Sequence, residues 1–160
     1  RGRTIWFLMT SRPDLVPVAL KRQGRAEEHI ALFPPGTPQE RATVFEALRA
    51  RLRIPIESGR PLAELFAQVP HAMSAADIEG ILVRASRRMA SAGLATLSFD
   101  LLRELIRDCQ PPAYPLEIDY QRLIAAMECT SRALLPPDLA VMPSGTIAQR
   151  LAELRAALGR

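Results

Sequence analysis

Lysine is almost absent from this 160-residue chain: Lys21 stands alone, so 20 of the 21 basic residues are arginine. The formal net charge of +4 is therefore carried mostly by guanidinium groups, which keep their protons at every physiological pH. The excess is small, and basic residues alternate with Asp and Glu along most of the expected helices, as on solvated helix faces. Charge alone therefore does not favour a nucleic-acid partner.

Cysteines and long apolar runs are also scarce. Cys109 and Cys129 have neither CxxC nor metal-ligand spacing and fall in apolar helical stretches, so we expect small buried side chains and a reducing cytoplasm. No apolar run approaches the ~18 residues of a membrane span, and the apolar stretch in RGRTIWFLMT at the start is too short for a signal peptide. We therefore expect a cytoplasmic protein with no membrane partner.

A phosphate-binding P-loop, G-x-x-x-x-G-K-[ST], is missing, because the single lysine follows Leu20 instead of a glycine. An apolar strand ending in Asp-Glu, which would hold Mg²⁺, is missing too. The first residue is not Met, and we expect the chain to be a piece of a longer protein. We expect these 160 residues alone to hydrolyse no ATP and to carry no bound cofactor or metal.

Two apolar runs near the start have the composition of strands. The segments TIWFLM (residues 4–9) and EHIALF (residues 28–33) are rich in β-branched and aromatic residues and are bounded by Pro and Gly. Between them, the spacing predicts an Arg-Pro-Asp turn, one helical turn of Val-Ala-Leu, and a turn that is broken by Gly24. We therefore expect a two-strand α/β remnant over residues 1–35.

The remaining sequence predicts a mainly α fold. Two expected helices begin with capping boxes, in which Thr37 pairs with Glu40 and Ser74 pairs with Asp77. Apolar residues at helical spacing and 48% apolar content predict a packed core. Helices are expected over 37–52, 61–69, 74–93, 98–109, 116–135 and 146–159. In the last of these, apolar residues repeat at intervals of four, three and four, a seam that could pack on the body or on another chain: Ile147, Leu151, Leu154 and Leu158.

The segment between the two expected strands resembles a known family. TSRPDLVPVALKRQGR, residues 10–25, is similar to the sensor-1 to arginine-finger segment of AAA-family ATPases, T-N-R-P-D-x-[IL]-D-P-A-[LI]-x-R-x-G-R, without a gap. The resemblance continues through HIALFPPGTPQERATVFEAL and through SAADI at residues 74–78, which is similar to the family's S-G-A-D-[IL]. It covers about residues 4 to 112 and implies a helical lid over 36–112, with a helical extension over 113–160.

The resemblance implies catalytic roles for four residues of the segment. Arg22 and Arg25 would be arginine fingers, planar and permanently charged groups that neutralise a γ-phosphate bound by a neighbouring subunit. Thr10 and Ser11 match the sensor-1 pair, which holds the attacking water. Ser11 replaces the family's Asn with a shorter hydroxyl side chain, so a turn-capping role is an alternative. The less favoured alternative is that both arginines are ordinary surface charges.

Four residues of the expected lid match nucleotide-contacting positions of the family. Val44 and Leu48 match positions that flank adenine and ribose, although Leu48 cannot form the hydrogen bond that the family's frequent His makes. Ala75 and Ala76 match the Gly-Ala pair whose small size lets a helix start approach the nucleotide.

The resemblance implies a parent protein that couples hydrolysis of ATP, with Mg²⁺, to the remodelling of a protein substrate. Its partners would be the neighbouring subunits of a homo-oligomeric ring, usually a hexamer. The alternative is a helical scaffold that has kept the fold and lost the chemistry. It is favoured by the departures from the family pattern at Ser11, Pro17, Val18, Leu48 and Ala75. Nucleic-acid-handling relatives fit less well, because no basic winged-helix pattern follows the lid.

Overall fold

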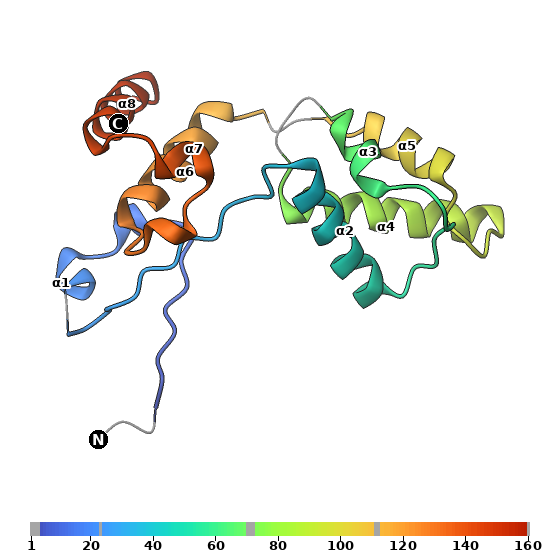
Figure 1. Ribbon diagram of the computed structural model, residues 1–160, viewed down its shortest axis with the longest axis horizontal. Coiled ribbons are helices and arrows are strands. Elements are labelled where there is room, and N and C mark those ends of the chain that lie inside the picture. Colours follow the sequence, from blue (N-terminus) through green and yellow to red (C-terminus); the bar gives the residue numbers. More distant parts are fainter. Residues whose placement is uncertain (1–3, 23, 70–72, 111–112, 160) are drawn as a thin grey trace. The chain divides into compact units, whose positions relative to one another are not determined.

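The computed structural model describes residues 4–22, 24–69, 73–110 and 113–159, and the fold is mainly helical, as the sequence predicts (Figure 1). The chain divides into two compact units. The central unit comprises residues 34–113, and the terminal unit combines the residues up to 33 with those from 114 onward. The segments predicted as an N-terminal remnant and a C-terminal extension thus belong to one unit.

The central unit is a helical bundle. Its described residues form the helices α2 (Pro38–Leu52), α3 (Leu62–Ala67), α4 (Ala75–Ala92) and α5 (Phe99–Arg107). Each of these helices begins and ends within two residues of its expected bounds. Helix α2 packs against both α3 and α4. The four helices expected between residues 36 and 112 are therefore present.

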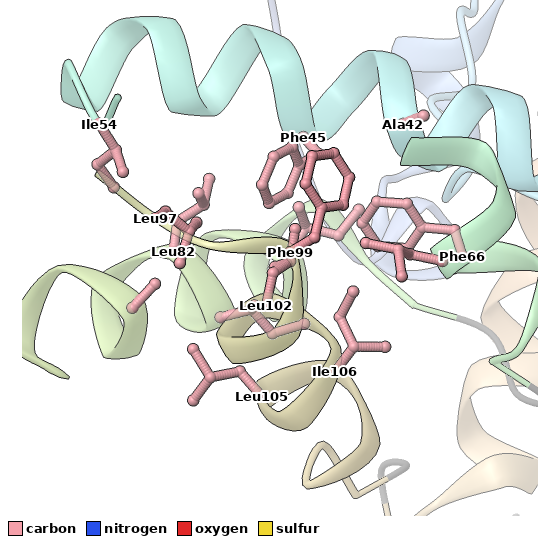
Figure 2. Packing of buried hydrophobic residues seen from close by; sticks show 14 of the residues in the cluster. Ala42, Phe45, Ile54, Phe66, Leu82, Leu97, Phe99, Leu102, Leu105 and Ile106 are labelled. Carbon is pink, nitrogen blue, oxygen red and sulfur yellow. The ribbon is translucent and has the colours of Figure 1, made fainter. Parts of the chain in front are cut away.

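The core of the central unit is drawn from all four helices (Figure 2). The rings of Phe45 and Phe66 meet edge to face, with their centroids 5.8 Å apart, and both side chains are fully buried. Leu82 of α4 and Leu102 of α5 are also fully buried. Because burying one such side chain contributes about 1.5–3 kcal/mol, this shared core holds the short helices in place.

The local helix signals are confirmed. In both predicted capping boxes the hydroxyl accepts from the N3 backbone amide: Thr37 Oγ1 from Glu40 at 3.1 Å, and Ser74 Oγ from Asp77 at 3.2 Å. The carboxylates bond back to the N-cap amides, and Gly93 ends α4 in the left-handed conformation at φ 65°. These starts and stops were readable because each depends on residues that are three or four apart in the chain.

One feature of the central unit had no sequence signal. Ile56 and Leu97 form an isolated parallel bridge, in which the amide of Leu97 donates to the oxygen of Pro55 at 2.9 Å and the amide of Glu57 donates to the oxygen of Leu97 at 3.0 Å. The bridge joins the loop after α2 to the loop before α5. It closes that end of the bundle without forming a strand.

The terminal unit is also helical. It contains the 3-10 turn η1 (Pro13–Leu15), the single turn α1 (Val18–Lys21), and the helices α6 (Pro115–Glu128), η2 (Arg132–Leu134), α7 (Pro137–Ala140) and α8 (Ser144–Ala157). The Arg-Pro-Asp turn and the Val-Ala-Leu helical turn are thus where the sequence predicts them. The short helix α7 was not predicted, and η2 lies within the range that was predicted as the end of one longer helix.

The core of the terminal unit lies between α6 and α8. The predicted seam of α8 packs inward, with Ile147, Leu151 and Leu154 buried and Leu158 at the margin. Facing residues include Tyr120 and Leu123 of α6. The seam therefore packs on the chain's own helix. Of the two thiols, Cys109 lies against the central core, and Cys129 donates to the oxygen of Ser131 at 3.4 Å; both are half-buried rather than buried.

Helix α6 ends earlier than predicted. The apolar pattern suggested a helix over 116–135, but Cys129 adopts an extended conformation, with φ −68° and ψ 127°. The amide of Thr130 then donates to the oxygen of His29 at 3.1 Å. Because this bond takes the backbone away from the helical ladder, the helix ends at Glu128, and the remaining predicted turns become η2.

The two expected strands are not formed within the described residues. Residues 4–9 and 28–33 are chain without strand pairing, and the side chains of Ile5 to Met9 are 70–91% exposed. A strand needs a neighbouring backbone that accepts and donates its ladder bonds. The segment 4–9 meets none here, and the segment 28–33 meets only the Thr130 region. Composition therefore identified apolar segments but not their pairing.

Candidate functional site

The candidate site begins where the exposed apolar segment ends, at Thr10. The hydroxyl of Thr10 accepts from the amide of Arg12 at 2.9 Å, which turns the chain. Arg12 then donates two hydrogen bonds to Asp14, from Nε to Oδ1 at 2.9 Å and from Nη2 to Oδ2 at 2.7 Å. This pairing raises the pKa of Arg12, chiefly through the side-chain bond. Thr10 and Ser11 are exposed, and Thr10 acts here as a turn-forming group.

The next residues build a tight corner. Pro17 precedes α1, and the amide of Leu20 donates to the oxygen of Pro17 at 2.9 Å. After α1, Gly24 takes φ 86°, a conformation that a side chain disfavours, and the amide of Arg25 donates to the oxygen of Arg22 at 3.1 Å. The predicted break at Gly24 is confirmed.

Arg22 and Arg25 flank this corner, and both are exposed. Arg22 is extended, with φ −71° and ψ 145°, directly after α1. Arg25 folds back, so that its Nη1 donates to the oxygen of Ala19 at 3.1 Å. One bond leaves most of the five guanidinium donors of Arg25 able to meet an anion. The turn that carries Arg22 and Arg25, called the arginine turn from here on, thus presents two permanently charged side chains on one short loop.

The four residues predicted to contact the nucleotide belong to the central unit, whereas Arg22 and Arg25 belong to the terminal unit. Val44 and Leu48 are half-buried on α2 and pack against the central core. Ala75 and Ala76 are the first two residues of α4 and are exposed. Ala75 and Ala76 therefore leave a helix start open to approach, whereas Val44 and Leu48 already contact other apolar side chains.

The comparisons with known proteins add no relative. No family model, curated protein or solved structure matches this chain. In the part of the chain that the structure describes, no cluster of His, Cys, Asp and Glu is fit to hold a metal ion. No helix among those residues is long and apolar enough to cross a bilayer. The function therefore has to be argued from the residues and their geometry.

A second basic surface lies on the central unit. Arg84, Arg87 and Arg88 of α4 line a shallow groove of about 390 Å³ together with Leu105 of α5 and Asp108, which follows α5. Arg84 approaches Asp108 at 3.4 Å, and Arg88 approaches Glu104 at 3.7 Å. Exposed carboxylates therefore lie beside two of the three arginines of this groove.

Sequence reasoning missed the residues that hold the arginine turn. Lys21 Nζ lies 2.6 Å from Glu128 Oε1, and these residues are 107 positions apart. His29 and Thr130 join the same region through backbone and side-chain bonds. The only available signal was the isolated lysine in an otherwise arginine-based chain. It could not indicate which acidic residue was its partner.

Proposed function

We propose that this chain is the C-terminal part of a AAA ATPase module, which supplies arginine fingers and a helical lid to nucleotide sites of a homo-oligomeric ring. The parent would couple ATP hydrolysis to the remodelling of a protein substrate. Its ring would be a hexamer, as is usual in the family, and it would act in the cytoplasm without a membrane or nucleic-acid partner. The strands of its nucleotide-binding sheet would include residues 4–9 and 28–33.

The observation that carries the proposal is the exposed arginine turn after the apolar segment. A finger must project from its own subunit toward a neighbour's phosphate, and Arg22 and Arg25 are exposed on a corner that is shaped by Gly24. Their planar guanidinium groups match the spread of charge over phosphate oxygens. A lysine at either position would provide a point charge but not the two parallel N–H donors of a guanidinium group.

The exposed segment 5–9 supports the same proposal. Five consecutive apolar residues, including Trp6 and Phe7, are exposed, so both faces of the extended chain lack cover. A continuous apolar run of this kind is typical of a strand buried on both faces of a parallel sheet. A sheet supplied by other residues of the parent would bury these side chains and pair their backbone.

The central unit supports the lid assignment. It is a bundle of capped helices, and the small residues Ala75 and Ala76 stand exposed at the start of α4. ATP and Mg²⁺ would be held mainly by other residues of the parent, since this sequence has neither a P-loop nor an apolar strand that ends in Asp-Glu. Phosphate affinity and metal binding would come from the parent's P-loop and acidic strand end. The roles left to this chain are the fingers, the sensor pair Thr10–Ser11, and the lid contacts.

A second candidate, a scaffold without catalysis, is favoured by one observation. Val44 and Leu48 are packed against the core of the central unit, and Leu48 offers no hydrogen-bonding group to a ribose. The two candidates differ in the parent's upstream sequence. An ATPase needs an intact P-loop and an Asp-Glu strand end there, and a scaffold does not.

The decisive experiment measures ATP turnover and nucleotide affinity in the parent protein with Arg22→Ala or Arg25→Ala. We expect turnover to fall on the order of 10³-fold, while affinity stays nearly unchanged, because the P-loop supplies most of the binding. Arg25→Lys should rescue poorly. Arg60→Ala is the matched control, because Arg60 is an exposed arginine of the central unit. Unchanged turnover in both finger variants would refute the proposal.

A further inference from the structure

The arginine turn is tied at both ends to one place in the chain, the carboxyl end of α6. On one side, Lys21, the residue directly before Arg22, places Nζ 2.6 Å from Glu128 Oε1. On the other side, His29, which follows Arg25 by four positions, meets Glu128 and Thr130. A loop whose two ends share one anchor has far fewer conformations than a loop held at one end.

The bonds on the His29 side are specific. The amide of His29 donates to Thr130 Oγ1 at 3.1 Å, and the amide of Thr130 donates to the oxygen of His29 at 3.1 Å. The ring Nδ1 of His29 lies 3.0 Å from the oxygen of Glu128. Because a carbonyl oxygen only accepts, this contact is a hydrogen bond when Nδ1 of the ring carries the proton. These bonds orient the chain that leaves the turn.

The ion pair on the Lys21 side is partly shielded from water. The side chain of Lys21 is 17% exposed and that of Glu128 is 31% exposed, whereas both members of most other ion pairs in the described residues are more exposed. Partial burial weakens screening and favours one geometry. Lys21, the only lysine of the chain, is the cation of this ion pair.

The anchor itself rests on a packed core. Helix α6 contributes Tyr120, Leu123 and Ile124 to the core that it shares with α8, so Glu128 stands at the end of a fixed element. The position of the turn is therefore set by the C-terminal helices of the terminal unit. Among the described residues of 10–25, the hydrogen bonds of Thr10, Arg12 and Arg25 span six residues or fewer, whereas η1 also contacts α6.

We propose that Glu128 and Thr130 are positioning residues for the fingers, so that the C-terminal helices α6 and α8 control how Arg22 and Arg25 are presented to the neighbouring subunit. The inference rests on the proposed function. It assigns the terminal helices a part in hydrolysis at the next subunit's site, which they would exert through the position of the two arginines. If the bonds to Glu128 and Thr130 are lost, Arg22 and Arg25 keep their guanidinium groups, but these groups occupy many positions instead of one.

The first part of the test uses the 160-residue chain and needs no ATP. Amide exchange is measured at Arg25 and Thr130 in Glu128→Gln and in Thr130→Val, with Leu151 of α8 as the internal reference. We expect several-fold faster exchange at Arg25 and an unchanged rate at Leu151. Asp138→Asn is the matched control, because it removes another ion pair of this unit, Arg122–Asp138 at 2.6 Å. If Glu128→Gln does not fold, Lys21→Met opens the same pair from its other side.

The second part measures turnover in the parent. Glu128→Gln and Thr130→Val should lower kcat several-fold with the KM for ATP unchanged, because positioning of a finger affects the transition state and not nucleotide binding. Reversing the pair, with Lys21→Glu and Glu128→Lys together, should restore much of the loss. A merely structural role would change KM and kcat together and would show no rescue.

The outcomes separate the two proposals. Unchanged exchange at Arg25 in the anchor variants overturns the inference and leaves the finger assignment intact. Faster exchange with an unchanged kcat, in a parent where Arg25→Ala abolishes turnover, also overturns only the inference. If Arg22→Ala and Arg25→Ala themselves leave turnover unchanged, the proposed function fails, and the positioning role fails with it.

Discussion

The guanidinium of Arg41 donates from Nη1 to the main-chain oxygen of Val69 at 3.4 Å, inside the central unit, where Arg41 is 7% exposed. The same side chain reaches the oxygens of Phe66, Pro35 and Gly36 at 3.4–3.5 Å. It thereby joins the start of α2 to the end of α3. Carbonyl groups of two chain segments, one before α2 and one at the end of α3, therefore depend on one buried cation.

We expect Arg41→Met to destabilise the central unit by about 2 kcal/mol, since each buried acceptor that is left unsatisfied costs roughly 1–3 kcal/mol and these bonds are long. Arg41→Lys should recover only part of the loss, because lysine lacks the fork that reaches several oxygens. Amide exchange at Phe45 and Ile81 measures the free energy of opening. Arg60→Met is the control, and an equal effect at Arg60 would contradict a special role for Arg41.

The capping carboxylate of Glu40 predicts a pH dependence. Its pKa is lowered, first by bonds from the backbone amides of Thr37 and Gly36. A carboxyl group whose pKa is lower in the folded state stabilises the fold above its ordinary pKa, and this contribution is lost as the pH falls through the lowered value. Glu40→Gln should therefore weaken the central unit near neutral pH, and its deficit should shrink below about pH 4. Thermal unfolding at the two pH values checks this. A deficit that is independent of pH would contradict it.

The two helix ends at Arg53 and Gly93 predict opposite effects of substitution. Both residues take the left-handed conformation, Arg53 at φ 55° and Gly93 at φ 65°. Only glycine adopts this conformation without a steric cost. Arg53→Gly should stabilise the chain by roughly 0.5–1 kcal/mol, and Gly93→Ala should destabilise it by about the same amount. Urea unfolding of both variants measures the difference. Changes of the same sign would refute the reasoning.

Removal of residues 114–160 should affect the two units differently. The buried core of the terminal unit, including Leu123, Leu151 and Leu154, lies in the removed segment; among the described N-terminal residues, Phe33 packs on this core and η1 contacts α6. The central core contains no residue from this segment. The truncated chain should keep the amide resonances of α2 to α5, while residues 10–33 lose their bonds to Glu128 and Thr130. Unfolding of α2 to α5 in the truncated chain would contradict the division into two units.

Much of the local structure follows from the sequence by itself. The capping boxes at Thr37 and Ser74, the stop at Gly93 and the corner at Gly24 were predicted, because each uses groups that lie within a few residues of one another. The seam of α8 was also predicted, because its apolar residues repeat at helical spacing. Sequence could not choose between a partner in the same chain and a partner in another.

Tertiary structure decided the rest. Arg41 looks like any exposed helix arginine in the sequence, but its burial depends on carbonyls 25 and 28 residues away. Lys21 meets Glu128 across 107 positions, and α6 ends at Glu128 because the amide of Thr130 donates to the oxygen of His29 instead of continuing the helix. The apolar segment 5–9 has strand composition but forms no strand, because a ladder requires a second backbone that no residue pattern within the segment supplies.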